Sequence, residues 1–97
     1  MEVCRLPNIF TVGGYKVFFW SNENNEPIHV HITKGQPNAA STKVWLTKNG
    51  GCIVANNKDR ISNKDLDKLL EIIQAHYFII CAEWKKHFKV NQIQFYC

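Results

Sequence analysis

Hydrophobic and polar residues follow a strand-like pattern in the first half of the chain. Residues 15–21 form a β-branched and aromatic run between a glycine pair and an asparagine-rich segment, which predicts a strand. Residues 28–34 alternate strictly between apolar and polar side chains, as in a strand that is buried on one face. The polar connection between the two runs is short enough for a hairpin, so we expect antiparallel pairing.

Two further strands are predicted near the middle of the chain. In residues 42–46, Val44 and Leu46 lie on the face opposite Lys43 and Trp45. A turn at residues 49–51, which contain two glycines, could then return the chain into a short fourth strand at residues 52–55.

From Ser62 onward the spacing of apolar residues changes to that of a helix. Intervals of three, four and seven residues draw one stripe along one helix face: Leu66, Leu69, Leu70, Ile73, Tyr77, Ile80, Cys81, Trp84 and Phe88. Ser62 and Asp65 resemble a capping box, and lysines gather at the far end, where the helix dipole is negative. The pattern predicts one long helix, and Ile72 and Ile79 widen its apolar stripe enough to indicate a second contact surface.

The last residues alternate again, and residues 91–97 could add a terminal strand at the edge of the sheet. We find no linker and no internal repeat, so residues 1–97 are interpreted as a single domain. The predicted fold class is α+β: a small antiparallel sheet of three to five strands, packed on one long C-terminal helix.

The amino-acid composition indicates what kind of protein this is but does not identify a function. Hydrophobic residues make up 45% and charged residues 21%, which is typical of folded domains, and no segment has the length of apolar sequence that a membrane span needs. The start of the chain lacks the pattern of a secretory signal, so we expect a cytoplasmic protein. The net charge of +4 favours RNA, DNA or an acidic protein as a partner. The four cysteines contain no C-x-x-C pair, so we expect free thiols.

The face of the sheet that carries His29 and His31 is predicted to be rich in aromatic residues. Lys43 and Trp45 share this face if Val30 and Val44 face the helix. Strand one is apolar on both sides, so it contributes either Lys16, Phe18 and Trp20 or Tyr15, Val17 and Phe19. One helix cannot cover both faces of a sheet, and exposed aromatics usually mark a partner. Lys43, Trp45 and Trp20 are therefore candidate binding residues.

The two histidines admit three kinds of chemistry. Side chains two apart on a strand project side by side, about 7 Å apart at Cα, and can place two imidazole nitrogens on one metal ion. Glu26 could complete a set of two histidines and one carboxylate, suited to iron, manganese or zinc, so His29, His31 and Glu26 are also candidate catalytic residues. The alternatives are a hydrogen-bonded structural role and contact with a substrate or nucleic acid. No cofactor-binding motif is present, so the cofactor is either none or a divalent metal.

The order of these segments resembles a known family. Residues 26–31 read E-P-x-H-x-H, residues 15–21 before them read Y-K-V-F-F-W-S, residues 43–46 after them read K-V-W-L, and a helix with a distal Trp84 follows. This arrangement, over residues 7–88, resembles the small bacterial domain-of-unknown-function family numbered 4160. Members usually open with Pro-Thr where this chain has Pro7 and Asn8.

The resemblance implies small cytoplasmic prokaryotic proteins without an established reaction, often encoded beside another small protein in pairs that look like toxin-antitoxin modules. Two functions are therefore predicted. The first is an interaction module, one partner of such a pair, that binds a protein or RNA through the aromatic and histidine face, as a homo-oligomer or with a small partner protein. The alternative is a metal-dependent or histidine-based nuclease or hydrolase that uses His29, His31 and Glu26.

Overall fold

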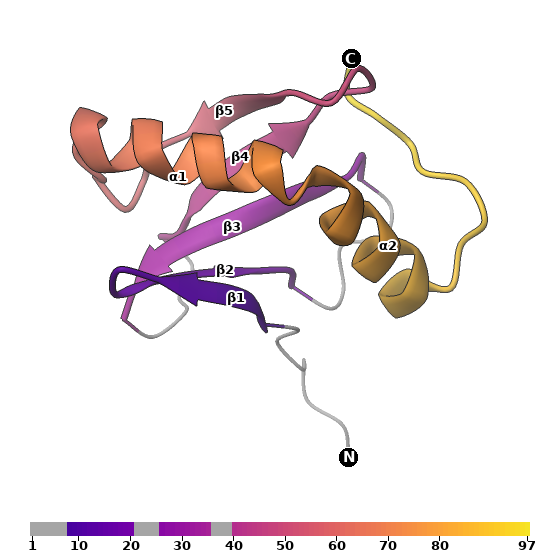
Figure 1. The fold of residues 1–97 in the computed structure, drawn as a ribbon, viewed down its shortest axis with the longest axis horizontal. Helices are drawn as coiled ribbons and strands as arrows, with labels where there is room; N and C mark the ends of the chain where they lie inside the picture. The colour runs from indigo at the N-terminus through magenta and orange to yellow at the C-terminus, as the bar shows by residue number, and fades with distance from the viewer. Residues whose placement is uncertain (1–7, 21–25, 36–39) are drawn as a thin grey trace.

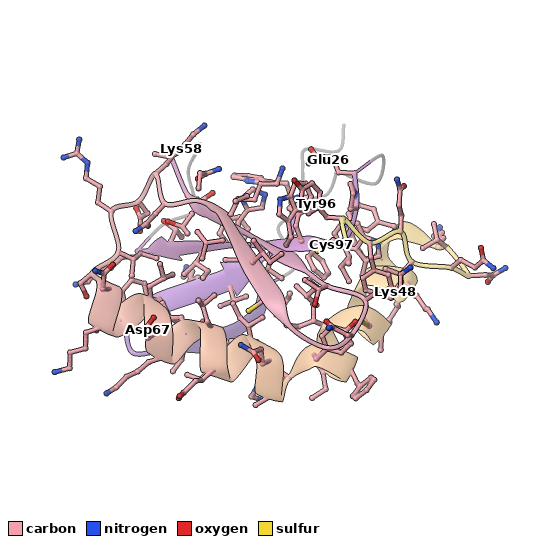
Figure 2. The ribbon with its side chains drawn as sticks, turned by 90° about the horizontal axis from the view of Figure 1, so that it is seen from above. Glu26, Lys48, Lys58, Asp67, Tyr96 and Cys97 are labelled. Atoms are coloured by element: carbon pink, nitrogen blue, oxygen red, sulfur yellow. The ribbon has the colours of Figure 1, made fainter. Side chains whose placement is uncertain are left out.

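A computed structural model describes residues 8–20, 26–35 and 40–97. The described residues form one antiparallel sheet in the order β1-β2-β3-β4-β5, followed by two helices (Figure 1). The strands are β1 (Asn8–Val12), β2 (Tyr15–Phe18), β3 (His29–Lys34), β4 (Thr42–Leu46) and β5 (Cys52–Asn56). The helices are α1 (Asn63–Ala75) and α2 (Tyr77–Phe88), and they lie on one side of the sheet (Figure 2). The α+β class and the antiparallel pairing of β2 with β3 are confirmed.

The strand β1 was not among the predicted strands. It pairs with β2 through a two-residue turn in which Gly13 has φ 55° and Gly14 has φ 83°. Positive φ at both central residues is the geometry of a type I′ turn, which suits the twist of a hairpin and which glycine adopts without strain. The glycine pair was interpreted only as the start of the next strand, although it is itself a hairpin signal.

The hydrophobic core lies between the sheet and the helices. Val30, Ile32 and Val44 are fully buried on the helix side of the sheet, as predicted. Of the two alternating sets of residues in strand one, Tyr15, Val17 and Phe19 face the core. The residues on the opposite face of β2 therefore share the face of the two histidines.

The prediction of one long helix is met only in part, because α1 and α2 follow one another directly but are separated at His76. The Nδ1–H group of His76 donates to the carbonyl oxygen of Ile72 at 2.9 Å, and the backbone N–H of His76 reaches the same oxygen at 3.1 Å. His76 itself has φ −106° and ψ 19°, which lies outside the helical region and changes the direction of the chain. The next residue is anchored elsewhere, since the Tyr77 hydroxyl donates to the carbonyl of Thr47 in the β4–β5 turn. As a result, α2 continues toward the end of the sheet where β3 begins (Figure 1).

The predicted start of the helix is confirmed. The Ser62 hydroxyl accepts the backbone N–H of Asp65 at 3.2 Å, which satisfies one of the unpaired donors of the first turn. The Asp65 carboxylate accepts the Tyr15 hydroxyl at 2.8 Å, so the same residue ties the helix start to β2.

The predicted terminal edge strand is wrong. Residues 91–97 have no regular secondary structure and cross the ends of β3 and β4, where the Ile28 N–H donates to Gln94 and the Lys48 N–H donates to Cys97, each at 2.8 Å. The sheet edges are β1 and β5, and the pairing of each with its neighbour contains a register irregularity, which makes an edge a poor template for another strand. Ile93 and Phe95 still pack on the core. Within the described ranges, no helix has the length and apolar character to cross a membrane.

Candidate functional site

The face of the sheet turned away from the helices, here called the aromatic face, gathers most of the predicted site residues. Cross-strand pairing places Phe18 beside His31, His31 beside Lys43, and His29 beside Trp45. Tyr96 reaches the same face from the C-terminal segment and lies above the sheet together with Glu26 (Figure 2). The aromatic face comprises Lys16, Phe18, Trp20, His29, His31, Lys43, Trp45 and Tyr96.

His29 is fully buried although it lies opposite the core. Its exposed fraction is 0%, and its Nδ1 lies 2.8 Å from the carbonyl oxygen of Pro27. Because a carbonyl only accepts, this bond requires the proton on Nδ1. The ring contacts Trp45 on the aromatic face and Trp84 of α2, with both centroid distances 5.5 Å. His29 thus joins the aromatic face to the helical side of the molecule at this end of the sheet.

His31 is also buried, with an exposed fraction of 7%. Its Nδ1 lies 3.1 Å from the Ser41 hydroxyl, and its ring stacks on Phe18 with a centroid distance of 5.6 Å. The two imidazoles meet edge to face at 5.0 Å. Both histidines therefore lie side by side opposite Val30 and Ile32, as the alternation predicted, and both are hydrogen-bonded, which was one of the alternatives left open.

The predicted metal set is not assembled. The Glu26 carboxylate pairs with the Lys43 ammonium at 2.5 Å, so its charge is directed to a lysine. Over the part of the chain that the structure describes, no three histidine, cysteine, aspartate or glutamate side chains are grouped so that they could hold a metal ion. His29 and His31 therefore lack a third ligand within that part.

Lys43, Trp45 and Tyr96 form a stack. The Lys43 Nζ lies over the indole of Trp45 at 4.3 Å from its centroid, and the Tyr96 ring is parallel to that indole within 4° at 4.9 Å. Cation–π contacts and parallel aromatic stacking both fix the orientation of a tryptophan. Tyr96 is 58% exposed although Trp45 covers one of its faces, so its outer face is open to solvent.

Trp20 lies at the other end of the aromatic face. It is half-buried and meets Phe18 edge to face at 5.3 Å and His31 at 6.2 Å. The predicted binding residues Trp20 and Trp45 therefore flank the histidine pair. Tyr96 was not predicted, although the alternation in residues 91–97 places it opposite Phe95 and thus away from the core.

Burial makes two of the described cysteines, Cys52 and Cys81, poor nucleophiles. Cys52, Cys81 and Cys97 are free thiols, as expected. Burial raises the pKa of the Cys52 and Cys81 thiols, which lowers the fraction of reactive thiolate.

Comparison with known proteins places the chain in a family. The structure defines the class of protein: an α+β domain with one sheet, a buried histidine pair and an exposed aromatic stack. The family model for the domain of unknown function DUF4160 matches residues 14–85, and the chain belongs to that family. The match includes both histidines, Lys43, Trp45 and Trp84, and it ends before Tyr96. No curated protein and no solved structure matches the chain.

Proposed function

We propose that this protein is an interaction module that binds single-stranded RNA on its aromatic face. The observation that carries the proposal is the stack of Lys43, Trp45 and Tyr96, in which the outer face of Tyr96 is open. Unpaired bases stack on exposed aromatic rings, and a ring that is itself supported by a second aromatic ring is held in place for such stacking.

The charge of the protein supports an anionic ligand. The net charge is +4, and Lys16 lies on the aromatic face because it alternates with Tyr15 and Val17 of the core. Lys58 lies above the sheet on the same side as Tyr96 (Figure 2). The charge of Lys43 is offset by Glu26, so attraction for phosphates falls mainly on the other lysines.

The family resemblance adds a setting for this activity. We infer a cytoplasmic protein that acts as one partner of a toxin-antitoxin-like pair, either as a homo-oligomer or together with a second small protein. RNA on the aromatic face leaves the helical side of the molecule available for that protein. A protein bound on the aromatic face is the competing outcome of the test below.

The hydrolase alternative has less support. A general acid or base must reach the proton that it transfers, whereas His29 is fully buried and its Nδ1 is bound to Pro27. Glu26 is paired with Lys43. These contacts favour a role for the histidines in holding the aromatic rings.

The test is a binding titration of fluorescein-labelled single-stranded RNA, followed by anisotropy at low and moderate salt. Tyr96→Ala should weaken binding by about 1 to 3 kcal/mol, the usual contribution of one stacked base, and Tyr96→Phe should restore it. Phe78→Ala is the matched control, because Phe78 is an exposed aromatic on α2, away from this face. Binding should also quench the tryptophan fluorescence of the wild type.

Three outcomes would refute the proposal: no RNA binding, equal binding by Tyr96→Ala, or equal losses in Tyr96→Ala and Phe78→Ala. Loss of a co-purified protein in Tyr96→Ala, without RNA binding by the wild type, would assign the aromatic face to a protein partner.

A further inference from the structure

The first turn of α2 exposes two neighbouring large apolar residues. Phe78 is 83% exposed and Ile79 is 54% exposed, whereas the adjacent Tyr77 is buried. Phe78 meets the Tyr77 ring edge to face at 5.2 Å, so its ring extends the buried aromatic cluster onto the surface. Adjacent exposed apolar side chains of this size usually mark a contact surface.

Beside Phe78 lies a shallow, open cleft of about 510 Å³ between α2 and the C-terminal segment, here called the α2 cleft. Its apolar lining comes from both walls and includes Tyr77 and Phe78 from α2 and Ile93 and Phe95 from the segment. Ile93 and Phe95 are half-buried, so the cleft opens onto the edge of the core.

The charged residues of the α2 cleft are all basic. Lys48 and Lys85 line it, and both side chains are exposed. No carboxylate side chain is among the lining residues of the described chain, and Glu83 of α2 does not line the cleft. The lining also includes the polar residues Asn91 and Gln92, so it combines aromatic and aliphatic side chains with amides and two ammonium groups. This combination is complementary to an apolar side chain flanked by carboxylates.

We propose that the α2 cleft binds an acidic peptide segment of another protein, with one large apolar side chain inserted beside Phe78 and carboxylates facing Lys48 and Lys85. This site is separate from the aromatic face and does not depend on RNA binding. Buried aromatic anchors supply most of the energy of such interfaces, and rim charges mainly set orientation and partner choice.

The probe is a fluorescein-labelled synthetic helical peptide with leucines along one side and glutamates along the other. The control peptide has the same sequence with lysines in place of the glutamates. The glutamate peptide should bind the full chain, and the lysine peptide should not. Phe78→Ser and Lys85→Glu should each weaken binding by about tenfold or more, as expected for a central anchor and a facing charge. In the amide NMR spectrum, the peptide should shift the signals of Tyr77, Phe78 and Phe95.

Ile53→Ser is the matched control, because Ile53 is an exposed apolar residue on β5 that does not line the α2 cleft. It should leave peptide binding unchanged, as should Tyr96→Ala, so a failure of the RNA proposal can be told from a failure of this one. Thermal unfolding checks that Phe78→Ser remains folded, as expected for an exposed side chain.

The proposal is overturned if the two peptides bind equally, if neither binds, or if Phe78→Ser and Ile53→Ser behave alike. Self-association that is lost in Phe78→Ser would assign the cleft to a second copy of this chain. Displacement of the peptide by single-stranded RNA from the wild type and from Tyr96→Ala would assign it to nucleic acid.

Discussion

Replacing Trp84 by alanine tests how α2 is attached to the sheet. Trp84 is 3% exposed and lies on the apolar stripe that the sequence predicted. Its indole contacts Phe88 at 4.4 Å, Phe19 at 5.1 Å and His29 at 5.5 Å between ring centroids. It therefore touches its own helix, the core and His29 at once.

The expected loss follows from these contacts. Removing a fully buried tryptophan or phenylalanine ring costs about 3 to 5 kcal/mol, because transfer free energy is lost and a cavity remains. Aromatic pairs add about 0.5 to 1.5 kcal/mol each beyond their buried area, and Trp84 makes an edge-to-face pair with Phe19. Mutational losses of this kind already include the ring contacts, so we expect Trp84→Ala to lower the free energy of unfolding by about 3 to 5 kcal/mol. This is a large part of the roughly 5 to 15 kcal/mol typical of a domain.

Urea unfolding followed by far-ultraviolet circular dichroism measures this loss without using the fluorescence of the tryptophan that is removed. Phe78→Ala on the same helix is the control and should cost less than about 0.5 kcal/mol, since an exposed surface position contributes little. A loss below about 1 kcal/mol for Trp84→Ala would show that the indole does not fill the core, and the assignment of the α2 face would be refuted.

Two further predictions concern titratable residues. Replacing both His29 and His31 by glutamine should cost about 1 to 3 kcal/mol in urea unfolding, because glutamine retains hydrogen bonding but loses the ring contacts. Unchanged stability with lost RNA binding would instead make the pair a direct binding site. Stability should also fall in strong alkali, because the hydrogen bond to Asp65 and burial raise the pKa of Tyr15, and burial raises the pKa of Tyr77. In the unfolded chain the pKa of tyrosine is about 10. Because the pKa is higher in the folded state, the hydroxyl stabilises the fold fully below about pH 10, and this stabilisation is lost as the pH rises through the folded pKa. Thermal unfolding midpoints that stay constant to pH 12 or so would contradict this reasoning.

The strands β3 and β4 could be predicted because a buried face imposes a period of two. In β3 the alternation of His29, Val30, His31 and Ile32 assigned every side chain to its observed face. The same alternation could not reveal burial, because both faces of β3 are covered and both histidines are buried, as the valine is. A polar residue on the face opposite the core was therefore compatible with either a solvated or a buried position.

The break at His76 could not be predicted from periodicity. The apolar stripe runs without interruption from Ile73 to Tyr77 and Ile80, and no proline or glycine occurs there. The break depends on the bond from the His76 imidazole to Ile72 and on the anchoring of Tyr77 to the β4–β5 turn. The second of these contacts joins residues 30 positions apart, so it cannot be predicted from the spacing of residues within the helix.

Three residues of the segment that reads E-P-x-H-x-H are connected to the same tryptophan, Trp45. Glu26 pairs with Lys43, whose ammonium lies over the indole of Trp45. Pro27 accepts from the imidazole of His29, whose ring meets the same indole edge to face. Glutamate, proline and first histidine thus converge on one tryptophan, and that tryptophan supports the exposed ring of Tyr96. If the aromatic face binds RNA as proposed, Glu26, Pro27 and His29 hold the stacking surface without touching its ligand, and a buried histidine contributes to binding through Trp45.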